Sequence, residues 1–82
     1  MRIYLTRHAR ERMKAYKISE EEVEKALKFP ERQVEGYRGR LIAEKSLNDH
    51  ILRVVYEKKE EEIVVITVYP ARKRRYWDES GI

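Results

Sequence analysis

The chain has 82 residues, of which 41% are hydrophobic and 41% charged, with no cysteine and a formal net charge of +4. We therefore expect one domain with one core, and we exclude a disordered chain, disulfides, thiolate catalysis and cysteine-bound zinc. No run of residues is long and apolar enough for a signal peptide or a membrane span, which predicts a cytoplasmic protein without membrane contact.

The N-terminal residues predict a short extended segment followed by a helix. Ile3–Leu5 forms either a strand or an extended lead-in. Thr6 is a typical N-cap, because its hydroxyl can accept a hydrogen bond from a free backbone N–H of the first turn. The helix is expected over Arg7–Tyr16, with an apolar stripe at helical spacing made of Ala9, Met13 and Tyr16.

A second helix has a clearer start. Ser19 and Glu22 have the spacing of a capping box, in which each side chain bonds the other residue's backbone N–H. Ile18 and Val23 lie where a hydrophobic staple would close around this box. Pro30 ends the helix, since proline provides no N–H and restricts the residue before it.

The rest of the chain has the pattern of antiparallel strands separated by turns. The turn signals are Gly36–Gly39, Asn48-Asp49 and Lys58–Glu61. The expected strands cover residues 33–37, 40–47, 51–57 and 62–69, the first of them weak. These elements predict an α+β fold in which two N-terminal helices pack on one face of a three- to four-stranded antiparallel meander sheet.

A two-residue turn at Asn48-Asp49 would pair Glu44 with Arg53 and Ala43 with Val54. A similar argument for the next hairpin pairs Arg53 with Thr67, Val54 with Ile66 and Tyr56 with Val64. The face toward the helices would then carry Leu41, Ala43, Leu52, Val54, Tyr56, Val64, Ile66 and Val68. The opposite face would carry Ile42, Glu44, Arg53, Val55, Val65, Thr67 and Tyr69. A slip of one residue would exchange the two sets.

The opposite face therefore brings together Glu44, Arg53, Thr67 and Tyr69. A carboxylate, a guanidinium, a hydroxyl and a phenol are suited to phosphodiester cleavage without a metal. The guanidinium can hold a phosphate and stabilise developing charge, while the carboxylate or phenol moves protons. The alternative is a Glu–Arg pair on a solvated face, which contributes little.

His8 is a further candidate for acid–base chemistry. It lies in the first turn of the expected first helix, close to free backbone N–H groups that favour anions. Arg7 and Arg12 would add contacts to phosphates. The alternative is a histidine that only packs or caps at the helix border.

The C-terminal segment contains a basic and aromatic run, Arg72, Lys73, Arg74, Arg75, Tyr76 and Trp77. Such residues neutralise phosphates and stack on bases, although a solvated run with Trp77 folded back onto the domain is the alternative. No spacing of His, Asp or Glu resembles a metal site, so neither a metal nor another cofactor is expected. The excess of Glu, Lys and Arg over side-chain amides is typical of a heat-adapted source.

Taken together, these segments resemble a known family. The segments that carry the resemblance are Thr6-Arg7-His8-Ala9 with Arg12-Met13, Ile18–Val23, Leu52–Tyr56 and Ile63–Tyr69. The pattern is similar to that of small prokaryotic proteins of unknown function grouped with BrnT-like and RelE-like toxins in the barnase/colicin/RelE-type nuclease fold. The resemblance extends from about Ile3 to Ala71, and it implies one RelE/BrnT-like domain over residues 1–77 with a short tail at 78–82.

The resemblance implies a toxin-like, metal-independent endoribonuclease that acts on RNA such as ribosome-associated mRNA and is neutralised by a small antitoxin protein. By motif, His8 matches the histidine of the first helix, Arg53 the mid-sheet arginine, and Thr67 and Tyr69 the last strand. Two alternatives stay open: a non-catalytic nucleic-acid- or protein-binding module on the same fold, and an interaction protein that pairs through an open sheet edge. The oligomeric state is open as well.

Overall fold

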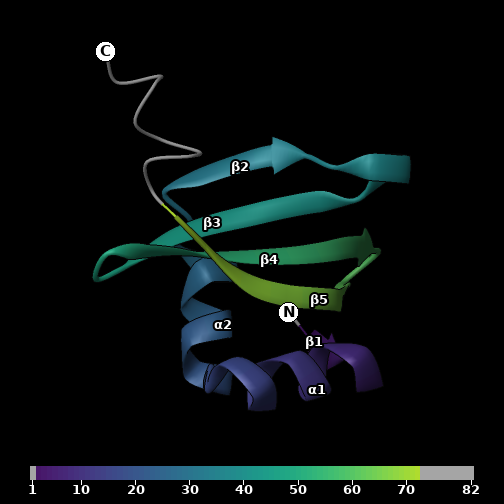
Figure 1. The fold of residues 1–82 in the computed structure, drawn as a ribbon. Helices are drawn as coiled ribbons and strands as arrows, with labels where there is room; N and C mark the ends of the chain where they lie inside the picture. Colours follow the sequence, from purple (N-terminus) through teal and green to yellow (C-terminus); the bar gives the residue numbers. More distant parts are fainter. Residues whose placement is uncertain (1, 73–82) are drawn as a thin grey trace.

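A computed structural model describes residues 2–72 of the chain, which form two helices, five strands and one short 3-10 turn (Figure 1). In chain order the elements are β1 Arg2–Leu5, α1 Arg7–Tyr16, α2 Glu20–Lys28, β2 Arg32–Glu35, η1 Tyr37–Gly39, β3 Leu41–Leu47, β4 His50–Lys59 and β5 Glu62–Arg72. The first helix occupies the predicted range, and the second begins directly after Ser19 and ends before Pro30, as predicted. Neither described helix has the length and apolar character that crossing a membrane requires.

The sheet confirms the α+β class but corrects its details. The strand order is β1-β5-β4-β3-β2, and β1 runs parallel to β5 while every other neighbouring pair is antiparallel. The prediction of three or four strands, all antiparallel, is therefore wrong on both points. The physical reason is that a four-residue segment carries no local signal for its partner, and β1 pairs with a strand about 60 residues away in the chain.

Both helices begin at the predicted caps. The Thr6 hydroxyl accepts a hydrogen bond from the Ala9 N–H at 3.1 Å and donates one to the Ile66 carbonyl, also at 3.1 Å. The start of α1 is thus tied directly to β5. At α2, Ser19 and Glu22 make both hydrogen bonds of the capping box.

Both helices lie on one face of the sheet (Figure 1). One hydrophobic core joins the helices to this face. Ala9 and Met13 of α1 and Val23 and Ala26 of α2 contribute to it from the helix layer. The sheet contributes Ala43, Leu52, Val54, Tyr56, Ile63, Val65 and Val68. Tyr16, which we assigned to the apolar stripe of α1, is 44% exposed, because α1 ends at this residue.

A β-bulge in β5 decides which of its side chains face the helices. The pairing runs from Val55 with Thr67 directly to Tyr56 with Val65, so Ile66 is the extra residue. Consequently Val65 is fully buried in the core, while Val64 and Ile66 are only partly buried. The predicted register for this hairpin is wrong. Arg53 pairs with Tyr69, two residues beyond the predicted Thr67, and Tyr56 pairs with Val65, one residue beyond the predicted Val64. The predicted β3–β4 register is confirmed throughout.

Candidate functional site

Four side chains form a continuous row across four neighbouring strands of the sheet. Arg32 of β2 pairs with Glu44 of β3. Glu44 also pairs with Arg53 of β4, and Arg53 pairs with Tyr69 of β5. Arg53 lies between Leu52 and Val54, which both point into the core, so the row points away from the helices. We call these four residues, Arg32, Glu44, Arg53 and Tyr69, the polar row.

Arg53 connects the members of the polar row. Its Nε donates a hydrogen bond to Glu44 Oε2 at 2.8 Å, and its Nη1 donates one to the Tyr69 hydroxyl at 2.6 Å. Its guanidinium carbon also lies 5.5 Å from the centre of the Tyr69 ring, within range of a cation–π contact. Arg32 Nε lies 3.5 Å from the other oxygen of Glu44. One carboxylate is therefore shared by two guanidinium groups.

The centre of the polar row is buried although it faces away from the helix layer. Glu44 is 1% exposed and Arg53 is 9% exposed, whereas the Arg32 side chain is 41% exposed. A buried charge is tolerated only when it is paired and hydrogen-bonded, and both of these groups are. Glu44 thus holds Arg53 in one orientation, which makes it a positioning residue for the guanidinium.

The Tyr69 phenol is placed to act on a bound molecule. Its side chain is partly exposed, and its oxygen accepts the hydrogen bond from Arg53. Because that oxygen is the acceptor in this bond, the phenol proton is available to donate elsewhere. The polar row can therefore present a positive charge and a proton donor together, which suits recognition of an anion such as a phosphate.

A second row lies beside the first on the same face. Its residues pair across the same four strands and are all partly exposed: Val34, Ile42, Val55 and Thr67. Thr67 is two residues from Tyr69 on β5, so it points to the same side. It lies across from Val55 rather than from Arg53.

Comparison with known proteins assigns the chain to a family. Residues 5–70 match the model of a family described as a domain of unknown function, DUF4258. The chain belongs to the DUF4258 family. The DUF4258 match includes every member of the polar row. No curated protein and no solved structure matched the chain. The family description gives no activity and makes no link to BrnT-like or RelE-like toxins.

In this DUF4258 domain, His8 does not join the polar row. It is exposed in the first turn of α1, and α1 packs on the sheet face opposite to the one that carries Arg53. Arg7 and Arg12 are exposed on the same helix, with Arg7 Nε 3.6 Å from Glu11 Oε2. The structure thus brings together Glu44, Arg53 and Tyr69, places Thr67 beside them, and separates them from the residues predicted on α1.

The basic run at the end of the chain lies mostly outside the described residues. Arg72 is the last residue of β5 and is exposed. The other predicted nucleic-acid contacts, Lys73, Arg74, Arg75, Tyr76 and Trp77, fall beyond residue 72 and stay predictions.

Sequence reasoning missed Arg32 as a member of the site. We expected the weak strand to begin at Gln33, whereas β2 begins at Arg32 and pairs this residue with Glu44. The turn signal at Gly36–Gly39 predicts a hairpin, but it does not fix which residues face each other. The observed loop has five residues between the paired Glu35 and Leu41, so the pairing of Arg32 with Glu44 does not follow from that signal.

Proposed function

We propose that this DUF4258 domain is a toxin-like endoribonuclease that cleaves RNA without a metal, with its site on the sheet face that carries the polar row. The observation that carries the proposal is the Arg53 guanidinium, held by Glu44 at 2.8 Å and bonded to the Tyr69 phenol at 2.6 Å. The resemblance to RelE-like and BrnT-like toxins supports the same reaction class. The proposal replaces His8 with Tyr69 as the group that transfers a proton.

The charge of the polar row supports a phosphodiester substrate. Among the described residues of the row, two arginines, Arg32 and Arg53, accompany the one carboxylate, Glu44. An anion bound against Tyr69 would lie beside the Arg53 guanidinium. Positive charge fixed in advance at this point stabilises the extra negative charge that forms on the phosphate in the transition state.

In the proposed reaction the 2′-hydroxyl of RNA attacks the adjacent phosphorus, and its proton passes to water. The bond from phosphorus to the 5′-oxygen of the next nucleotide breaks, and Tyr69 donates its proton to that leaving oxygen. Arg53 stabilises the phosphate, while Glu44 holds Arg53. A metal is not required, because the side chains provide both the positive charge and the proton.

The test compares RNA cleavage in EDTA by the wild type, by Tyr69→Phe and by a control, Tyr4→Phe. Tyr4 is a good control because it lies on the same sheet face, on the edge strand β1 across from Val64, and is 56% exposed. We expect Tyr69→Phe to lower the cleavage rate by about 10²- to 10⁴-fold, the usual contribution of an acid or base, without weakening RNA binding. Tyr4→Phe should match the wild type.

Full activity of Tyr69→Phe would remove this residue from the mechanism. Absence of cleavage of any RNA by excess wild-type protein would refute the ribonuclease proposal. The toxin proposal also implies a small antitoxin partner. Co-expression with a small neighbouring gene product should relieve growth inhibition caused by the protein, and inhibition that no neighbour relieves would count against the antitoxin.

One observation favours a second candidate, a nucleic-acid-binding module without catalysis. In the part of the chain that the structure describes, neither histidine lies in the polar row, and Glu44 is engaged with arginines. Among the described side chains of the row, Tyr69 is therefore the one candidate for proton transfer. This candidate predicts RNA binding that weakens steeply with salt, with no turnover under any condition.

A further inference from the structure

The loop between β2 and β3 presents a solvent-exposed aromatic side chain. Tyr37, in η1, is 79% exposed, the highest value among the large hydrophobic residues that the structure describes. The guanidinium carbon of its neighbour Arg38 lies 5.5 Å from the centre of the Tyr37 ring. An arginine and an aromatic ring at this distance form a cation–π pair, and here the pair projects from the domain.

The backbone of this loop is tightly constrained. Gly36 N–H donates to the Arg40 carbonyl at 2.7 Å, and Arg40 N–H donates to the Tyr37 carbonyl at 3.2 Å. Arg38 and Gly39 both have left-handed backbone conformations, with φ of 60° and 76°. A non-glycine residue is disfavoured in this region, so Arg38 adopts this conformation at the expense of stability. The loop therefore holds Tyr37 and Arg38 outward on a closed turn.

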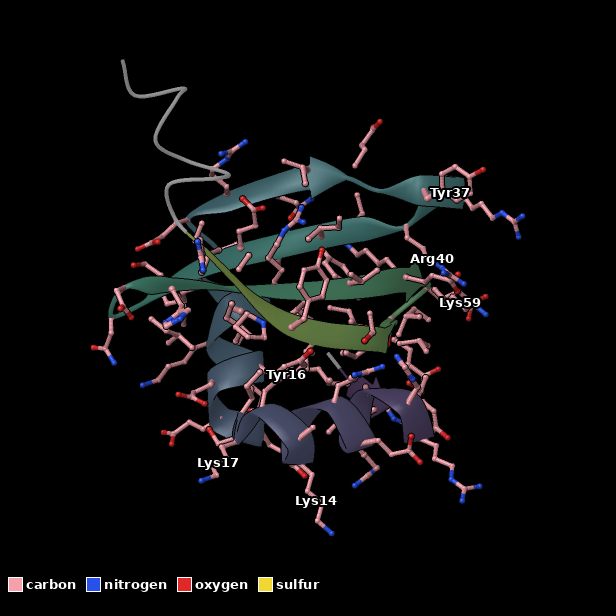
Figure 2. The ribbon with its side chains drawn as sticks, in the orientation of Figure 1. Lys14, Tyr16, Lys17, Tyr37, Arg40 and Lys59 are labelled. Carbon is pink, nitrogen blue, oxygen red and sulfur yellow. The ribbon has the colours of Figure 1, made fainter. Side chains whose placement is uncertain are left out.

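The loop that carries Tyr37, residues 36–40, contains two arginines and no carboxylate, while the neighbouring strand ends and the β4–β5 turn carry both cations and glutamates. Among the described residues no carboxylate pairs with Arg38, and Arg40 and Lys59 share the single carboxylate of Glu57, at 3.2 and 3.8 Å. Figure 2 shows Tyr37, Arg40 and Lys59 at the same end of the sheet, far from the labelled side chains of α1. An exposed ring among cations and glycines lacks the apolar neighbours of a typical protein-binding hot spot.

We propose that Tyr37 and Arg38 form a stacking site for a base of single-stranded RNA, next to the polar row. The base stacks on the exposed ring of Tyr37, and Arg38 contacts the adjoining phosphate. The inference rests on the proposed function and specifies its substrate, because bases in a duplex cannot reach the ring. Arg40, the last residue of this loop, precedes Glu44 by four residues, so the loop begins roughly 13 Å along the sheet from the polar row, within reach of one short oligonucleotide.

The test measures binding of a labelled single-stranded oligouridine by fluorescence anisotropy, with the same strand annealed to its complement as the duplex probe. The variants are Tyr37→Ala, Tyr37→Phe and a control, Phe29→Ala, which removes a 67% exposed aromatic residue at the end of α2. Loss of one stacked base should weaken single-strand binding by about 5- to 150-fold for Tyr37→Ala. Tyr37→Phe and Phe29→Ala should bind like the wild type, and the preference for the single strand should shrink only in Tyr37→Ala.

The outcomes separate this inference from the proposed function. If the wild type binds the oligouridine and Tyr37→Ala binds it equally well, the stacking site is wrong and the polar row is unaffected. If Tyr37→Ala loses affinity but the wild type cleaves no RNA, the stacking site stands and the ribonuclease proposal fails. If the wild type binds no single-stranded RNA at low salt but a protein partner is lost in Tyr37→Ala, the loop is a protein contact and the inference is refuted.

Discussion

Replacing Arg53 by methionine tests the central ion pair of the polar row. Methionine keeps most of the length of the side chain and removes its charge. The Glu44 carboxylate, which is 1% exposed, would then lose the donor that bonds it at 2.8 Å. Tyr69 would lose the same group at 2.6 Å. A buried carboxylate deprived of its main cation is strongly destabilising.

The magnitude follows from burial. Removing one partner of a buried ion pair typically costs about 3–5 kcal/mol, a large part of the roughly 5–15 kcal/mol that stabilises a small domain. The chain offers a matched control in Arg40, which directly precedes β3 and bonds Glu57 of β4 at 3.2 Å. Its side chain is 39% exposed, so Arg40→Met should cost less than about 1 kcal/mol.

The assay is urea unfolding followed by circular dichroism, with the free energy of unfolding obtained by linear extrapolation. We expect Arg53→Met to unfold at much lower urea than the wild type, and Arg40→Met to unfold close to it. The double variant Glu44→Leu/Arg53→Met should recover most of the loss, since an apolar pair often replaces a buried ion pair without cost. Equal losses in Arg53→Met and Arg40→Met would refute the argument from burial.

Three further predictions concern the rest of the fold. Thr6→Val removes both the N-cap of α1 and the bond to the Ile66 carbonyl, and should lower the free energy of unfolding by about 1–2 kcal/mol in the urea assay. Lys17 has a φ of 58° after α1, so Lys17→Gly should leave the thermal midpoint unchanged or raise it, and a clear decrease would contradict this. Burial raises the pKa of the Tyr56 hydroxyl above 10.0, so folding favours the neutral phenol. Stability should therefore be full below pH 10.0 and fall as the pH rises above it, and Tyr56→Phe should flatten that decline.

The helices and the first hairpin could be predicted from sequence because their signals are local. The cap at Thr6 and the capping box at Ser19 each lie within four residues of the groups they bond. The turn at Asn48-Asp49 fixes the β3–β4 register, so the pairing of Glu44 with Arg53 followed directly from it. This pair forms the centre of the candidate site, and it was predicted correctly.

The parts that could not be predicted depend on distant contacts or on one inserted residue. The segment around Ile66 is a run of valine, isoleucine and threonine, and none of these residues marks a bulge. The bulge nevertheless moves Tyr69 by one residue, to the position across from Arg53, and the position of the turn, which pairs Lys59 with Glu62, accounts for the other residue of the difference from the predicted register. The separation of His8 from Arg53 depends on which face α1 covers, and a helix of this pattern can pack on either face.

The pairing of β1 with β5 has a consequence for how the chain folds. In the described structure α1 packs mainly against β5, and its N-cap Thr6 donates a hydrogen bond to Ile66 of β5. The packing of the first helix therefore depends on a strand that is synthesised some 60 residues later. During synthesis, β2, β3 and β4 can form their hairpins first, while β1 and α1 cannot yet pack against β5. Contacts between such distant segments slow folding. This domain can therefore complete its fold only after β5 has emerged from the ribosome.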